Sequence, residues 1–136
     1  MAGVAAALEG RAPVVGVEPD TVPTLATALA AGGPVDVPVS GVAAEARGAT
    51  RLGAIAWTVA ERTGVRSALV DDADVVAARR VLWERYRLVV EHGAASVIAA
   101  LLSGAHRPEP GERVTAVLCG ANTAPDDLTP EAPRRH

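Results

Sequence analysis

The sole cysteine of the chain, Cys119, stands on a glycine turn directly after an apolar run. Residues 117–122 read Val-Leu-Cys-Gly-Ala-Asn. In an open α/β sheet, ligands bind beyond the carboxyl ends of the strands, which is where such a turn presents its side chains. A lone cysteine after a strand is more often a small buried hydrophobic residue, so both interpretations stand at this point. All 13 Lys+Arg residues are arginines, so the chain brings no lysine chemistry of its own.

Two carboxylates, Glu18 and Asp71, follow other apolar runs and could share a sheet edge with Cys119. The residues needed for phosphate binding by a glycine-rich loop and for zinc binding do not occur in the required pattern. The only Gly-Gly pair, at 32–33, follows a helical pattern, so no phosphate loop connects a strand to a helix. The three histidines (His92, His106 and His136) share no zinc-ligand spacing. A hydrolase or nucleotide binder is disfavoured, because a nucleophile elbow, a P-loop and a dinucleotide fingerprint are missing.

The elements that must position these groups alternate between short apolar runs and helical patterns. Strands are expected at 13–17, 67–70 and 113–119. Helices are expected at 1–9, 24–31, 52–62, from 71 through 86, and at 94–102. Strands separated by helices imply crossover connections and a parallel sheet. The predicted fold class is therefore α/β, a partial open parallel sheet with flanking helices in three layers.

The best helix opens at Asp71, which can cap it, with more acidic residues in the first turn. Its apolar face is expected to hold Val75, Ala78, Leu82 and Tyr86, with Arg79 off that face. The first helix, by contrast, starts at Met1 without a capping residue. Domains rarely begin on such a turn, which favours a chain cut from something larger, with a frayed terminal helix as the alternative.

Composition sets the outer limits. The chain has 136 residues, 49% hydrophobic and 21% charged, which suits one soluble globular domain. A net charge of −3 and few aromatic residues argue against nucleic-acid binding. One cysteine excludes an internal disulfide and is consistent with the cytoplasm. Residues 1–8 are apolar but too short to span a membrane, and we expect neither a signal peptide nor a membrane segment.

Four motifs in order resemble one family. They are Gly-Val-Glu-Pro at 16–19, Leu-Trp-Glu-Arg at 82–85, Leu-Val-Val-Glu at 88–91, and the turn at 117–122. Together they resemble the serine/threonine dehydratase (ammonia-lyase) and serine racemase group of fold type II pyridoxal-phosphate enzymes. The resemblance implies the carboxyl-terminal part of a large domain like that of tryptophan synthase beta, over residues 1–126. Residues 127–136 are then expected to form a disordered tail.

The resemblance implies a partial pocket for pyridoxal 5'-phosphate. It places Cys119 and Gly120 under the pyridine nitrogen and Glu91 near the ring edge. Ala46 falls where the family has a glycine that passes the cofactor by its backbone, so its Cβ must be accommodated. A neutral thiol at Cys119 would leave the ring nitrogen largely unprotonated, a weaker electron sink than an aspartate partner would produce. That suits removal of an α-proton followed by β-elimination.

The resemblance also implies a divalent-cation site in some members. Glu18 corresponds to a carboxylate ligand, Val22 to a backbone carbonyl ligand, and Thr24 to a position that is acidic in the family. Threonine is a departure, because hard cations prefer anionic oxygen ligands. Glu18 before Pro19 could equally end a strand.

The family's Schiff-base lysine, its glycine-rich phosphate loop and its small domain have no counterpart here. We therefore expect part of a serine or threonine ammonia-lyase, catalytically silent alone because a Schiff base needs a lysine amine. Its substrate would be a small amino acid. The alternative is a non-catalytic interaction or split-enzyme module that pairs with an amino-terminal partner chain or with itself, since an unfinished sheet exposes strand edges.

Overall fold

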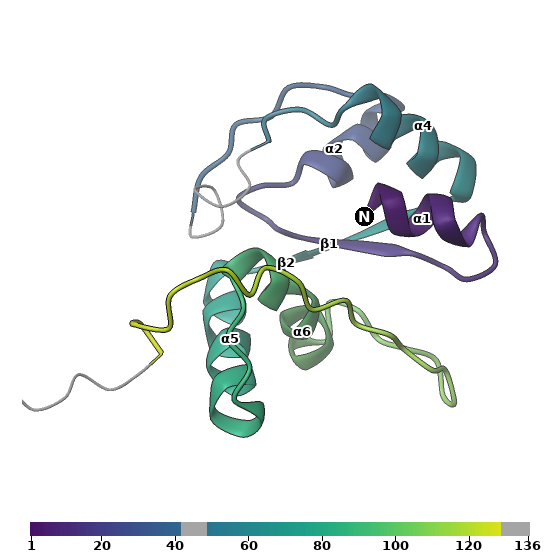
Figure 1. Ribbon diagram of the computed structural model, residues 1–136. Coiled ribbons are helices and arrows are strands. Elements are labelled where there is room, and N and C mark those ends of the chain that lie inside the picture. The colour runs from purple at the N-terminus through teal and green to yellow at the C-terminus, as the bar shows by residue number, and fades with distance from the viewer. Residues whose placement is uncertain (42–48, 129–136) are drawn as a thin grey trace, which may run out of the picture.

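The computed structural model describes residues 1–41 and 49–128, and the statements below concern these residues (Figure 1). The element order is α1 (Ala2–Leu8), β1 (Val15–Pro19), α2 (Thr24–Ala31), α4 (Ala54–Thr63), β2 (Arg66–Val70), α5 (Asp72–Tyr86) and α6 (His92–Ser103). Every helix expected from the sequence is present, and so are the first two expected strands. Glycines 32, 64 and 104 end three of the helices in the left-handed conformation that lacks a Cβ penalty.

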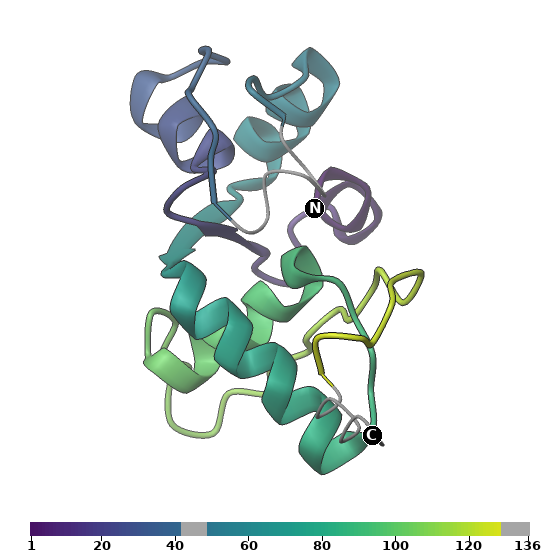
Figure 2. The ribbon, with the colours of Figure 1, turned by 90° about the vertical axis from the view of Figure 1, so that its left-hand side faces the viewer.

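The sheet is a parallel pair of strands with helices on both faces. Val15 of β1 lies opposite Arg66 of β2, and Pro19 lies opposite Val70. α1, α2 and α4 lie on one side of the strands and α5 and α6 on the other, a division that both Figure 1 and Figure 2 show. The predicted class, a partial open parallel α/β sheet in three layers, is confirmed.

Each helical layer has its own hydrophobic cluster. On the α5–α6 side, Val75, Ala78 and Leu82 pack against Val70 and the alanines of α6. The other side is built from Ala5, Leu25, Val59, Ala60 and Val65. Small side chains dominate both clusters, so the helices can approach the strands and each other closely.

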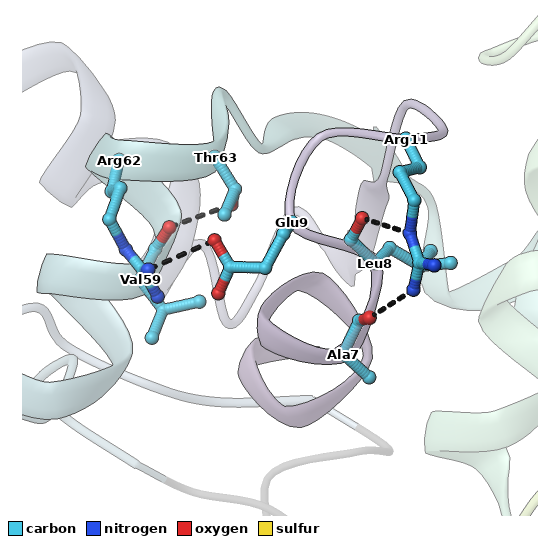
Figure 3. A network of polar contacts seen from close by, with 7 residues as sticks. All are labelled: Ala7, Leu8, Glu9, Arg11, Val59, Arg62 and Thr63. Atoms are coloured by element: carbon cyan, nitrogen blue, oxygen red, sulfur yellow. Dashed lines mark hydrogen bonds and ion pairs between the residues drawn. The ribbon is translucent and has the colours of Figure 1, made fainter.

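Surface charges join α1 to α4 (Figure 3). Arg62 of α4 donates a 2.9 Å hydrogen bond to the carboxylate of Glu9, just beyond the end of α1. Arg11 folds back and donates to the carbonyls of Leu8 and Ala7, at 3.0 and 2.8 Å. Those carbonyls are in the last turn of α1, which has no following turn to bond with them. The charged side chains therefore satisfy and orient the end of a short helix.

The prediction of a third strand at 113–119 is wrong. The segment is extended, but within the described part of the chain it forms no β-ladder. A strand requires a regular series of backbone hydrogen bonds to a neighbouring strand, and this segment has no such series in the described residues. Its apolar side chains are exposed instead, with Val117 at 57% exposure.

The predicted face of α5 needs two corrections. Val75, Ala78 and Leu82 are buried as expected, but Tyr86 is 65% exposed and Arg79 only 3% exposed. Arg79 follows Val75 by one helical turn, so it lies on the buried face, where the chain beyond Gly120 covers it. Tyr86 is the last residue of the helix and projects past the core. Asp71 occupies the N-cap position, but its side chain makes no capping hydrogen bond.

Among the residues described here, no helix is long and apolar enough to cross a membrane.

Candidate functional site

Two segments that are distant in the sequence meet at a tight corner, formed by Glu91 and Gly120. The backbone N–H of Glu91 donates a 2.8 Å hydrogen bond to the carbonyl of Gly120. Gly120 has a positive φ of 67°, and a Cβ there would come within 2.4 Å of the Glu91 side chain. Glycine is therefore required at position 120 for two reasons: the positive φ disfavours other residues, and a Cβ has no space. The structure thus brings together three of the four predicted cofactor residues, since Cys119 directly precedes Gly120.

Cys119 is exposed, and the interpretation as a buried hydrophobic residue is wrong. It lines a large cavity together with Gly93 and Ala94 from the first turn of α6. Glu91 stands at the N-cap of that helix with an extended backbone. The corner therefore places a thiol on the cavity wall beside the start of a helix. Glu91 and Gly120 support this wall from behind rather than lining the cavity.

Arg79 holds the corner in place, a role that the sequence analysis missed. Its Nε donates to the carbonyl of Val90 at 2.6 Å, one residue before Glu91. One terminal nitrogen donates to the carbonyl of Ala124 at 3.0 Å, and the other pairs with the Asp127 carboxylate. One buried guanidinium thus bonds to both segments that form the corner. The available signal was its helical spacing from Val75 and Leu82, which puts a charge on an apolar face.

The groups expected to bind a cation are engaged within the protein. The two oxygens of Glu18 accept hydrogen bonds from the backbone N–H groups of Leu25 (2.7 Å) and Ala26 (3.0 Å) in the first turn of α2. The carbonyl of Val22 accepts from the N–H of Thr24, whose hydroxyl donates to the carbonyl of Ala49. No group of three or more His, Cys, Asp and Glu side chains in the described ranges could hold a metal ion. This arrangement therefore does not support the predicted cation site.

Burial perturbs two ionisable groups near the strand ends. Desolvation raises the pKa of Glu18, and the hydrogen bonds from Leu25 and Ala26 oppose that effect. At the start of α6, desolvation and the positive charge of Arg79 lower the pKa of His92. His92, for which the sequence predicted no role, is therefore held toward its neutral form next to the corner.

Ala46, the fourth predicted cofactor residue, lies outside the described residues. So do residues 129–136 of the expected tail, whereas Asp127 contacts Arg79. Asp71 lies at the start of α5, at the carboxyl end of β2.

Three similar proteins carry related names. The phenylserine dehydratase of Ralstonia pickettii is 32% identical over 126 residues, which cover 90% of this chain and 39% of that one. The threonine deaminase of T.th. has 30% identity, a TM-score of 0.68, and coverage of 79% of this chain and 41% of that one. Maize serine racemase has 27% identity, a TM-score of 0.65, and coverage of 73% and 31%. The chain therefore spans about two fifths of the first two relatives.

A family model also matches most of the chain. The model of the pyridoxal-phosphate dependent enzymes matches residues 1–120, which include both strands and the turn at Cys119 and Gly120. The match extends over most of the chain, and the related structures share the parallel α/β arrangement described above. The chain belongs to the pyridoxal-phosphate dependent enzyme family.

Proposed function

We propose that this chain supplies the ring-facing wall of an ammonia-lyase site for a small hydroxy-amino acid such as serine or threonine. The observation that carries the proposal is the corner of Cys119, Gly120 and Glu91, which presents a thiol on the wall of a large cavity. The proposal also draws on the dehydratase and deaminase names of the relatives. The reaction removes the α-proton and the β-hydroxyl group as water, and one water molecule then hydrolyses the resulting imine to ammonia and a 2-oxo acid.

The residues present fit one edge of pyridoxal phosphate. When bound, the cofactor withdraws electrons from the substrate's Cα, which makes the α-proton acidic. The thiol of Cys119 is exposed on the cavity wall and can hydrogen-bond to a ring nitrogen without protonating it fully. Because Gly120 has no side chain and Glu91 fills the space behind it, the wall is fixed without protruding into the cavity.

The remaining parts of such a site are absent from this sequence. The cofactor forms a covalent bond with a lysine amine in enzymes of this type, and all 13 cationic side chains here are arginines. We therefore expect no turnover by the chain alone. A direct test mixes the purified chain with pyridoxal phosphate and borohydride and measures the intact mass. No stoichiometric adduct is expected, and an adduct at one specific residue would overturn this part of the proposal.

The positive test is a chimera. This chain replaces the matched 126-residue stretch of the Ralstonia pickettii phenylserine dehydratase, which retains the rest of that enzyme. We expect the chimera to bind pyridoxal phosphate, seen as visible absorbance, and to form a 2-oxo acid from L-serine or L-threonine. A chimera with Cys119→Asp should keep the absorbance but change its pH dependence, because a carboxylate would hold the ring nitrogen protonated. A folded chimera that binds no cofactor would refute the proposed function.

A further inference from the structure

Arg79 is a buried cation in the middle of α5, behind the cavity wall that carries Cys119. It is 3% exposed and does not itself line the cavity. A charge that is removed from water is costly unless its donors find acceptors. An apolar side chain at position 79 would be buried at a lower desolvation cost, but it could not bond to the backbone of two separate segments. The residue type at this position therefore points to a geometric role.

The bonds of this guanidinium lie on both sides of the hydrogen bond between Glu91 and Gly120. Its Nε donates to the carbonyl of Val90 at 2.6 Å, one residue before Glu91. A terminal nitrogen donates to the carbonyl of Ala124 at 3.0 Å, four residues after Gly120. Because a planar guanidinium presents its donors in a fixed fork, the two carbonyls are held at a fixed separation. The guanidinium therefore clamps the two segments that form the corner.

The strap, defined here as residues 120–128, is the segment that this clamp holds against α5 (Figure 1). Its Asp127 pairs with the other terminal nitrogen of Arg79, while the aspartate side chain stays 56% exposed. The family model matches residues 1–120, so the strap residues that bond to Arg79 lie outside that match. The bonds between Arg79 and the strap are therefore features of this chain rather than of the family match.

We infer that Arg79 is a positioning residue of the proposed cofactor site, which sets how far the Cys119 thiol stands from the ring. The inference rests on the proposed function, which assigns this thiol to the ring nitrogen. The coupling runs through the backbone, from the guanidinium to the strap and to Glu91, and from there to Gly120, which directly follows Cys119. Hydrogen bonds weaken steeply beyond their normal length, so a displacement of about 1 Å at Cys119 would remove the bond between the thiol and the ring.

Arg79→Lys tests the clamp, because it keeps the positive charge but loses the planar fork. The matched control is Arg80→Lys, on the exposed neighbouring residue of α5. Amide hydrogen exchange of the chain alone gives a readout without any cofactor. The N–H of Glu91, which bonds to Gly120, should exchange at least about tenfold faster in Arg79→Lys and at an unchanged rate in Arg80→Lys. Equal exchange rates in the two variants would overturn the inference.

The effect on the ring is measured in the chimera with the Ralstonia pickettii phenylserine dehydratase, loaded with isotopically labelled pyridoxal phosphate. The chemical shift of the ring nitrogen reports its protonation. A thiol that donates to this nitrogen favours the unprotonated form, so loss of the bond raises the pKa of the ring nitrogen. In Arg79→Lys the pH midpoint of the chemical shift should therefore rise. The Kd for the cofactor should increase about fivefold, the usual effect of losing one neutral hydrogen bond.

Asp127→Asn keeps the test decisive if Arg79→Lys does not fold. The side chain of Asp127 is 56% exposed, and the new amide keeps an acceptor oxygen for the guanidinium. The N–H of Glu91 should exchange about threefold faster, and the midpoint of the ring nitrogen should rise by less than in Arg79→Lys. Glu84→Gln, which neutralises an exposed carboxylate of α5, is the control and should change neither quantity.

The outcomes separate the inference from the proposed function. A folded chimera that binds no cofactor in any variant refutes the proposed function, and with it the link between Arg79 and the ring. A chimera in which Arg79→Lys unfolds at lower urea concentration but keeps the same Kd and the same ring-nitrogen midpoint refutes the inference alone. Arg79 would then serve stability and would not position the thiol.

Discussion

The two halves of segment 112–128 differ in their hydrogen bonding and in their exposure to solvent. The half beyond Cys119 is anchored by the bond between Gly120 and Glu91 and by the bonds from Arg79 to Ala124 and Asp127. The half before Gly120 is extended, exposed and outside any β-ladder in the described structure. The comparison shows that internal hydrogen bonds from Glu91 and Arg79 hold one half, whereas the other half has no comparable series of bonds in the described residues. The extended half lines a cavity together with residues of β1 and the first turn of α6.

The largest effect is expected at Arg79, whose removal would break the anchored half. Arg79→Met keeps much of the buried volume but leaves the carbonyls of Val90 and Ala124 without their donor. We expect a loss of about 3 kcal/mol in the free energy of unfolding, measured by urea denaturation. Arg80→Met, on the exposed neighbouring residue, should cost less than about 0.5 kcal/mol. Similar losses in both variants would show that Arg79 does not hold the corner.

Gly120→Ala tests the junction between the two halves and should have an intermediate effect. The new Cβ meets the Glu91 side chain at 2.4 Å, in addition to the strain of a positive φ. A loss of about 2 kcal/mol is expected in thermal unfolding, because the corner must open. The matched variant is Gly111→Ala, which has a φ of 83° but nothing within 4 Å of the added Cβ. It should lose only about 1 kcal/mol, and an equal loss would remove the contact with Glu91 from the explanation.

The smallest effect concerns Glu18 of β1 and the pH dependence of the free energy of unfolding. Burial raises the pKa of Glu18 above its ordinary value of 4.5, so the folded chain holds this proton more tightly than the unfolded chain. The resulting contribution to stability is complete below pH 4.5 and is lost as pH rises through the folded pKa.

Glu18→Gln should remove that pH dependence. The same variant should cost about 1 kcal/mol at neutral pH, because a single amide oxygen replaces the two acceptors at the start of α2. Urea denaturation across pH 4 to 7 measures both effects. Glu84→Gln, at an exposed position on α5, is the control. If Glu18→Gln shows the same slope with pH as the unsubstituted chain, the pH-dependent stability does not originate at Glu18.

The two strands that were correctly predicted and the one that was not show where sequence reasoning applies. The run expected at 13–17 became β1 at 15–19, which includes Glu18 and Pro19, and the run expected at 67–70 became β2 at 66–70. Local residue types therefore located both strands, although the bounds of β1 are displaced by two residues. Residues 113–119 have a comparable apolar pattern but no ladder. Hydrogen bonding between strands requires two partners, and one segment's sequence does not report whether the second is there.

The sequence by itself determined the order of helices and strands, the family, the lack of lysine, and the positions of Cys119, Gly120 and Glu91. These depend on residue types and local spacing, which the chain carries in any conformation. Only the tertiary structure decided that Arg79 is buried between two distant segments, that Glu18 bonds to α2, and that β1 pairs with β2 alone among the described residues. Each depends on which segments pack together, and that is settled by burial and hydrogen bonding across the whole fold.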